Sequence, residues 1–222
     1  NESRPINGSS ISNTCTITSQ FINSSGVAMG EPKLHYQAEV IVSNEKQSLA
    51  KRIEPGTLLP DTSSIGIGEK DTSLIYHPQR LFMDGVFKTI HDIISFDGKK
   101  LITKIADRSR AAIFADDPCP EFVTDVVLLD GMFQTGGVFE FLTDSFVVLP
   151  YKIKSLKFFK RGVKDVDYIC ITTRVSSDDE TDTFDIDLVD SDGNYLMELV
   201  EFQMVKLNRL PDDERIKEMV VF

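Results

Sequence analysis

An aspartate and a glutamine four residues apart, Asp130 and Gln134, are the side chains whose types and spacing best suit chemistry. Residues four apart lie on one face of an α-helix, so both side chains are expected to point into one site. Because the surrounding segment is apolar, a carboxylate at Asp130 is costly unless it is protonated or well hydrogen-bonded. A protonated carboxyl group is a general acid, and the Gln134 amide is placed to hold it. The alternative is that Asp130 reaches an exposed rim or satisfies a strand backbone group.

Several other kinds of site are missing from the sequence. It contains no H-E-x-x-H zinc motif, no G-x-S-x-G nucleophile motif and no phosphate-binding P-loop. Its three histidines, His35, His77 and His91, have no metal-ligand spacing to another His or to a Cys, and we expect no metal site. His35 and His91 fall in apparent strands, and we interpret them as structural or surface residues.

The segment 123–142 is predicted to be the helix that positions Asp130 and Gln134. It is longer than a typical strand, and Thr124 or Asp125 can cap its start. Apolar residues cover nearly its whole circumference, which predicts burial on all sides. The pair Gly136-Gly137 costs about 1 kcal/mol per residue relative to Ala in a helix. The glycines are explained by close approach of helix and sheet, or by room for an acyl or pantetheine arm of a substrate.

The rest of the chain is predicted to be mainly antiparallel β-structure. Turns are expected at 23–26, at Asp97-Gly98 and at 191–194, and the acidic segment 176–182 is expected to be a solvated hairpin tip. One antiparallel sheet wrapped around one buried helix, the α+β hotdog fold, satisfies both the amphipathic strands and the apolar helix. The expected strands cover residues 16–22, 34–42, 86–96, 100–106, 151–159, 168–174, 184–189 and 195–207.

The composition limits the classes of partner and the compartment. The chain has 222 residues, enough for one large domain or two modest ones, and a net charge of −11. That acidity disfavours nucleic acid and anionic membranes, which require a cationic surface. Three cysteines form no C-x-x-C pair, no apolar run is long enough for a membrane helix, and no apolar signal segment is present. We therefore expect a cytoplasmic protein with reduced thiols.

Residues 127–134, Val-Leu-Leu-Asp-Gly-Met-Phe-Gln, resemble the Leu-Leu-Asp-x-x-x-Gln helix of dehydratase domains in type I polyketide synthases and related multifunctional fatty acid synthases. The resemblance spans residues 73 to about 207 as the C-terminal half of a double hotdog, plus the tail of the first half in residues 14–43. Four further segments resemble family segments in the same order, namely 34–40, 81–87, 149–153 and 192–207.

The resemblance implies a domain plan and a reaction. Residues 1–45 would be tail strands of a first hotdog, 46–72 a linker, and 73–222 the C-terminal hotdog. The family eliminates water from β-hydroxyacyl thioesters on an acyl carrier protein to give enoyl thioesters, and Asp130 falls on its general acid, with Gln134 as the neighbouring amide. No permanent cofactor is implied, because the substrate rides on the carrier's phosphopantetheine. The implied partners are the carrier protein, other synthase domains and a second copy in a homodimer. The substrate-binding positions that we expect are Phe87, Phe133, Gly137, Leu149 and Pro150.

The sequence departs from the family pattern in several places. The usual His-Pro before Leu-Leu-Asp is Asp125-Val126, and the Gly-Pro-x-Phe-Gln motif is degenerate at 84–88. The catalytic His of His-x-x-x-Gly-x-x-x-x-Pro has no counterpart, and residues 1–72 are too few for a complete first hotdog. The chain is therefore either a piece of a longer synthase or a half that has lost activity. Two alternatives are a product-template-like polyketide cyclisation domain and a non-catalytic hotdog for dimerisation or docking.

Overall fold

The computed structural model describes residues 2–7, 10–43, 52–53, 74–108 and 125–210. The chain divides into two compact units, Asn1–Leu49 and Ala50–Phe222. The expected linker lies outside the described residues, apart from residues 52 and 53.

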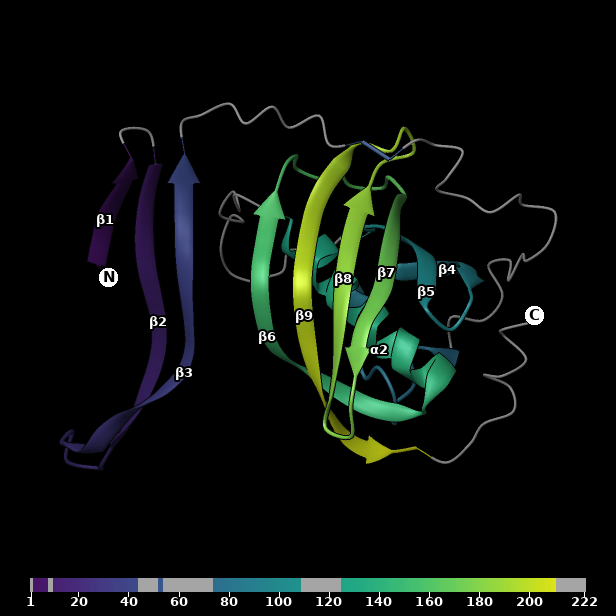
Figure 1. The fold of residues 1–222 in the computed structure, drawn as a ribbon. Helices are drawn as coiled ribbons and strands as arrows, with labels where there is room; N and C mark the ends of the chain where they lie inside the picture. Colours follow the sequence, from purple (N-terminus) through teal and green to yellow (C-terminus); the bar gives the residue numbers. More distant parts are fainter. Residues whose placement is uncertain (1, 8–9, 44–51, 54–73, 109–124, 211–222) are drawn as a thin grey trace. The chain divides into compact units, whose positions relative to one another are not determined.

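The first unit is a three-stranded antiparallel sheet in the order β1-β2-β3 (Figure 1). Its strands are β1 (Glu2–Asn7), β2 (Ser10–Ile22) and β3 (Ala28–Ser43). The turn between β2 and β3 confirms the predicted hairpin, because the Asn23 side chain accepts hydrogen bonds from the backbone N–H groups of Ser25 and Val27. Gly26, with φ of 78°, supplies the left-handed residue that this turn needs.

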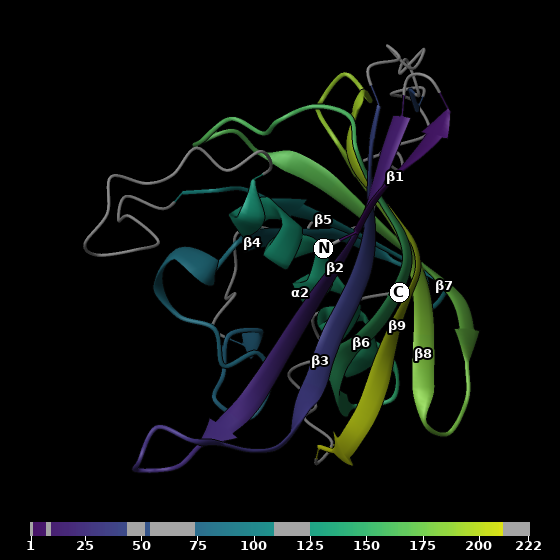
Figure 2. The same cartoon turned by 90° about the vertical axis from the view of Figure 1, so that its left-hand side faces the viewer.

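The second unit confirms the α+β hotdog fold. Six strands form one sheet in the order β4-β5-β7-β8-β9-β6, and every neighbouring pair is antiparallel. In Figure 1 the helix α2 lies behind β6–β9, and in Figure 2 it lies on one side of β7, β8 and β9. The strands are β4 (Ile90–Phe96), β5 (Lys100–Ile105), β6 (Phe146–Phe158), β7 (Tyr168–Ser177), β8 (Thr181–Val189) and β9 (Tyr195–Arg209).

The helix α2 (Val126–Thr143) is enclosed by the sheet, as its apolar circumference predicts. It begins at Val126 because the Asp125 side chain accepts hydrogen bonds from the N–H groups of Val127 and Leu128 and so caps the first turn. No residue of the helix is fully exposed. Among the described residues, no helix combines the length and the hydropathy that crossing a membrane requires.

Close helix–sheet packing explains two of the helical glycines. A Cβ on Gly136 would lie 2.6 Å from the Met204 sulfur of β9, and a Cβ on Gly131 would lie 2.7 Å from the Thr89 hydroxyl oxygen. Both distances are too short for ordinary van der Waals contact, so these positions require glycine unless their neighbours move. A Cβ on Gly137 would meet only a methyl group of Leu81, at 3.2 Å.

Several local predictions need correction. The strands expected at 16–22 and 34–42 each begin six residues earlier, at Ser10 and at Ala28. The strand expected from residue 151 begins at Phe146 and contains Pro150, which is tolerated because β6 is an edge strand of the sheet. The strand expected from residue 86 begins at Ile90 and is preceded by the short 3-10 helix η2 (Gly85–Phe87). The acidic tip expected at 176–182 is not solvated throughout, because Asp182 belongs to β8 and is fully buried.

Candidate active site

The side chains of Asp130 and Gln134 contact one another on one face of α2, as their spacing predicts. The Gln134 amide nitrogen Nε2 donates a hydrogen bond to Asp130 Oδ2 over 2.6 Å. The same nitrogen donates to the backbone carbonyl of Phe87, over 2.7 Å. Gln134 is buried and Asp130 is half-buried, so the carboxyl group lies at the accessible end of the pair.

Two hydroxyl groups hold the other end of the Gln134 amide. The Tyr76 hydroxyl donates to Gln134 Oε1 over 2.9 Å, and the Thr89 hydroxyl lies 3.4 Å from the same oxygen. The backbone N–H of Ile90 in turn donates to the Tyr76 oxygen over 2.7 Å. Neither Tyr76 nor Thr89 was among the site residues expected from the sequence, since both lie far from Gln134 along the chain and belong to no motif.

The surroundings of Asp130 favour its protonated form. Burial raises the pKa of the Asp130 carboxyl above its ordinary value, and the hydrogen bond from Gln134 offsets part of that rise. A carboxyl group that keeps its proton to higher pH and is partly accessible can donate that proton to a bound molecule. The geometry therefore suits a general acid.

The structure distributes the expected substrate-binding residues over three elements. Phe87 ends η2, and its carbonyl contacts Gln134. The ring of Phe133, on α2, stacks on that of Phe202, with centroids 5.0 Å apart. Gly137 packs against Leu81, as described above. Two further positions, both exposed on β6, are Leu149 and Pro150.

The three histidines lie on different parts of the chain, and among the described residues none is hydrogen-bonded to Asp130. His35 lies in the first unit, on β3, where its Nε2 is 2.6 Å from the Ser19 hydroxyl, and His77 is exposed. His91 lies on β4, where it is partly buried. Burial lowers the pKa of His91, and the nearby Arg108 adds to the effect. Among the described residues, no group of three or more His, Cys, Asp or Glu side chains is arranged to hold a metal ion.

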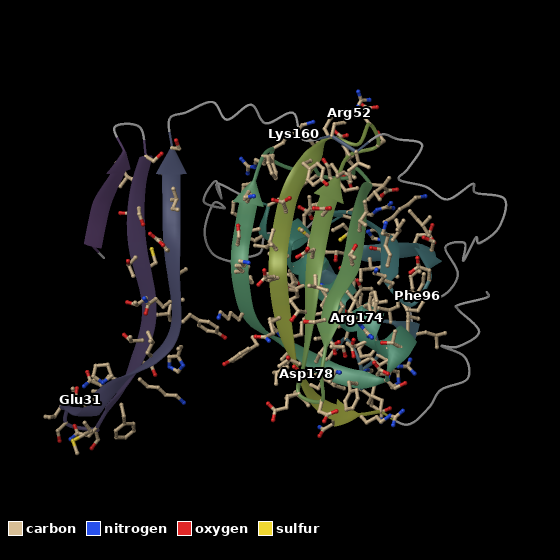
Figure 3. All side chains as sticks on the ribbon, in the orientation of Figure 1. Glu31, Arg52, Phe96, Lys160, Arg174 and Asp178 are labelled. Atoms are coloured by element: carbon tan, nitrogen blue, oxygen red, sulfur yellow. The ribbon has the colours of Figure 1, made fainter. Side chains whose placement is uncertain are left out.

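A second cluster of charged side chains lies farther along α2. Glu140 and Asp182 are fully buried between two cations, with Arg174 Nη2 2.7 Å from Glu140 Oε1 and Lys206 Nζ 2.9 Å from Asp182 Oδ2. Arg174, labelled on β7 in Figure 3, also lies 3.6 Å from Asp182. Burial, followed by the charge of Asp182, raises the pKa of Glu140 to about 7 even though both cations act in the opposite direction.

Comparison with known protein families identifies the family of this chain. A model of the family described as polyketide synthase dehydratase N-terminal domain matches residues 76–214, more than half of the chain. The chain belongs to the polyketide synthase dehydratase family. A search of curated proteins found no match.

Solved structures of polyketide synthase domains share the hotdog architecture of this dehydratase-family chain. A dehydratase domain of a trans-AT polyketide synthase from Brevibacillus brevis is 16% identical with a TM-score of 0.69, over 93% of this chain and 68% of that one. An N-terminal dehydratase from the difficidin assembly line is 15% identical with a TM-score of 0.60, over 99% and 74%. A trans-acyltransferase polyketide synthase enoyl-isomerase is also 15% identical, with a TM-score of 0.57, over 91% and 70%. At such identities the likeness shows the fold, and the reaction must be argued from the site.

Proposed function

We propose that this chain carries the acid half of a dehydratase site, which eliminates water from β-hydroxyacyl thioesters borne on the phosphopantetheine of an acyl carrier protein. The observation that carries the proposal is the half-buried Asp130 carboxyl, held at Oδ2 by the Gln134 amide. Its pKa is raised by burial, as proton donation requires. Membership of the polyketide synthase dehydratase family supports the reaction class.

The elimination needs an acid and a base acting on neighbouring carbons. A base removes the α-proton of the thioester, the bond between the β-carbon and oxygen breaks, and Asp130 gives its proton to the departing hydroxyl. The products are an α,β-unsaturated thioester and water, with the base protonated and Asp130 ionised. Without the proton from Asp130 the leaving group is hydroxide, which departs far less readily.

The base is proposed to come from a first hotdog half, as a His in a His-x-x-x-Gly-x-x-x-x-Pro segment. His35, His77 and His91 do not fit that segment. Residues 73–222 are accordingly proposed to be the C-terminal hotdog, following a linker at 46–72 and the tail strands of the first half at 1–45. The Asp-x-x-x-Gln pair on the central helix supports this placement, although the matching family is described as an N-terminal domain.

The test is an assay of enoyl-pantetheine thioester hydration, followed by loss of the enoyl absorbance. Three proteins are compared: the 222-residue chain, the same chain supplied with a first hotdog half that carries the His segment, and that pair with Asp130→Asn. We expect nearly silent hydration by the chain alone, restored hydration by the pair, and a loss of about 10²–10⁴-fold with Asp130→Asn.

Two outcomes would contradict the proposal. Robust turnover by the isolated chain that Asp130→Asn leaves unchanged would show that another residue is the acid. A complete pair that folds, yet is inactive with or without the substitution, would favour a non-catalytic docking module.

A further inference from the structure

We propose that Tyr76 is a positioning residue of the site, whose hydroxyl fixes the orientation of the Gln134 amide so that the amide nitrogen faces Asp130. This inference rests on the proposed function for its catalytic meaning, but its geometry stands by itself. Tyr76 lies within the residues that the family model matches, but outside the five short segments that carry the resemblance.

The direction of each hydrogen bond around Tyr76 follows from its donors. The backbone N–H of Ile90 can only donate, so at 2.7 Å it occupies a lone pair of the Tyr76 oxygen. The hydroxyl proton is then free to point to Gln134 Oε1, 2.9 Å away. Burial raises the pKa of Tyr76 to about 12, so the hydroxyl keeps this proton throughout the physiological range.

The amide of Gln134 has only one orientation that satisfies all its neighbours. With Oε1 towards the hydroxyls of Tyr76 and Thr89, Nε2 donates to the Phe87 carbonyl and to Asp130 Oδ2. The flipped amide would turn its oxygen towards the Phe87 carbonyl, so that two acceptors would face one another and the carbonyl would lose its donor. The Tyr76 proton therefore selects the orientation in which Asp130 receives a hydrogen bond.

Tyr76 is itself held by the segment around it. Its ring packs against the main hydrophobic core of the second unit. The backbone of Ile75 accepts hydrogen bonds from the N–H groups of His77 and Leu81, which closes a compact turn around the tyrosine. A series of hydrogen bonds, from the Ile90 N–H through Tyr76 and Gln134 to Asp130, thus links the backbone of β4 to the carboxyl group.

The expected consequence is a change in the titration of Asp130. The hydrogen bond from Gln134 lowers the pKa of Asp130 against the rise caused by burial. Without the Tyr76 hydroxyl, only the longer contact from Thr89 restrains the amide oxygen. The amide then rotates or flips in part of the population, and the Asp130 carboxylate loses stabilisation.

The experiment is carboxyl-detected NMR titration of the 222-residue chain, with the Asp130 signal assigned by Asp130→Asn. Tyr76→Phe removes only the hydroxyl, and Gln134→Leu removes the whole amide and sets the upper limit of the effect. The matched control is Tyr168→Phe, because the hydroxyl of the buried Tyr168 also accepts a backbone N–H bond, from Val163 over 2.7 Å, but does not contact Gln134.

We expect Tyr76→Phe to shift the Asp130 pKa upwards, in the same direction as Gln134→Leu, while Tyr168→Phe leaves it at the wild-type value. In the double variant Tyr76→Phe/Gln134→Leu the shift should equal that of Gln134→Leu alone, because Tyr76 acts only through the amide. An Asp130 pKa that is the same in Tyr76→Phe and wild type, in a chain that remains folded, overturns the proposal. If Tyr76→Phe does not fold, Thr89→Val provides the test: the Tyr76 hydroxyl alone should then hold the amide and keep the Asp130 pKa at the wild-type value. An upward shift as large as that of Gln134→Leu would overturn the proposal, because Thr89 would then be the residue that fixes the amide. None of these measurements depends on turnover, so failure of the dehydratase proposal would appear separately, as activity indifferent to Asp130→Asn.

Discussion

The helix α2 carries two carboxyl groups with raised pKa values in different settings, Asp130 and Glu140. Asp130 is half-buried, and the polar partner it has in the structure is the neutral amide of Gln134. Glu140 is fully buried and lies among Asp182, Arg174 and Lys206. A raised pKa is therefore not a sufficient mark of an active site, because burial produces it in both places. Accessibility and a neutral hydrogen-bond partner distinguish the carboxyl group that can give its proton to a substrate.

The largest expected effect is on turnover, and it should distinguish Asp130 from Glu140. In the pair of hotdog halves, Asp130→Asn is expected to lower turnover by about 10²–10⁴-fold, because a general acid is lost. Its free energy of unfolding should change little, since the Asn side chain keeps the shape and still accepts from Gln134. The comparison fails if Glu140→Gln lowers turnover as much as Asp130→Asn in proteins of equal stability.

The second effect concerns the stability of the charged cluster. Arg174→Met removes a cation that contacts Glu140, Asp182 and Asp144, and leaving buried carboxylates uncompensated costs about 3–5 kcal/mol. Denaturant unfolding at pH 8 measures the loss. Arg108→Met is the control, because the Arg108–Asp167 ion pair is exposed and is worth about 0–1 kcal/mol. If the two variants lost equal amounts of unfolding free energy, the buried carboxylates would not depend on Arg174 for compensation of their charge.

The third effect is the pH dependence of stability that Glu140 contributes. Its pKa is raised from 4.5 to about 7, so the folded state binds more protons than the unfolded state between these values. The free energy of unfolding should therefore fall as pH rises through this window, by about 1.4 kcal/mol for each unit of the shift. In Glu140→Gln the fall should be absent, which unfolding curves at pH 5 and pH 8 would reveal. A fall of the same size in the variant would assign it to another group.

The smallest expected effect is on stability at the helical glycines. It distinguishes a glycine needed for close packing from one that leaves space for a substrate. Gly131→Ala should destabilise the protein by about 1–3 kcal/mol, because the new methyl group meets Thr89 at 2.7 Å. Gly137→Ala should stay within about 1 kcal/mol of the wild type, since Leu81 can yield and Ala favours the helix. Turnover lost in Gly137→Ala at unchanged stability would instead assign Gly137 to the substrate arm.

The sequence predicts what local periodicity and capping determine. The helix that begins at Val126, its cap at Asp125 and the contact between Asp130 and Gln134 all follow from residues within a few turns of one another. Residues three or four positions apart in a helix lie next to one another on its surface. These parts of the fold and of the site were therefore predictable.

The parts that were not predictable depend on partners distant in the chain. Tyr76 and Thr89 precede Gln134 by 58 and 45 residues, and only the tertiary fold brings them to it. Asp182 reads as part of a solvated acidic loop, yet it is buried, because Lys206 of the neighbouring strand β9 neutralises it. Pro150 reads as a strand boundary, and the edge position of β6 is what admits it to the strand.

The most direct test of the central claim is the titration of Asp130 itself in the wild-type chain. Carboxyl-detected NMR, with Asp130→Asn to assign the signal, gives its pKa without any substrate or partner. Because burial outweighs the hydrogen bond from Gln134, the account predicts a pKa above the ordinary value of 3.8. A pKa at or below that value would show a solvated carboxylate at the rim of the helix, and Asp130 would then not be the general acid.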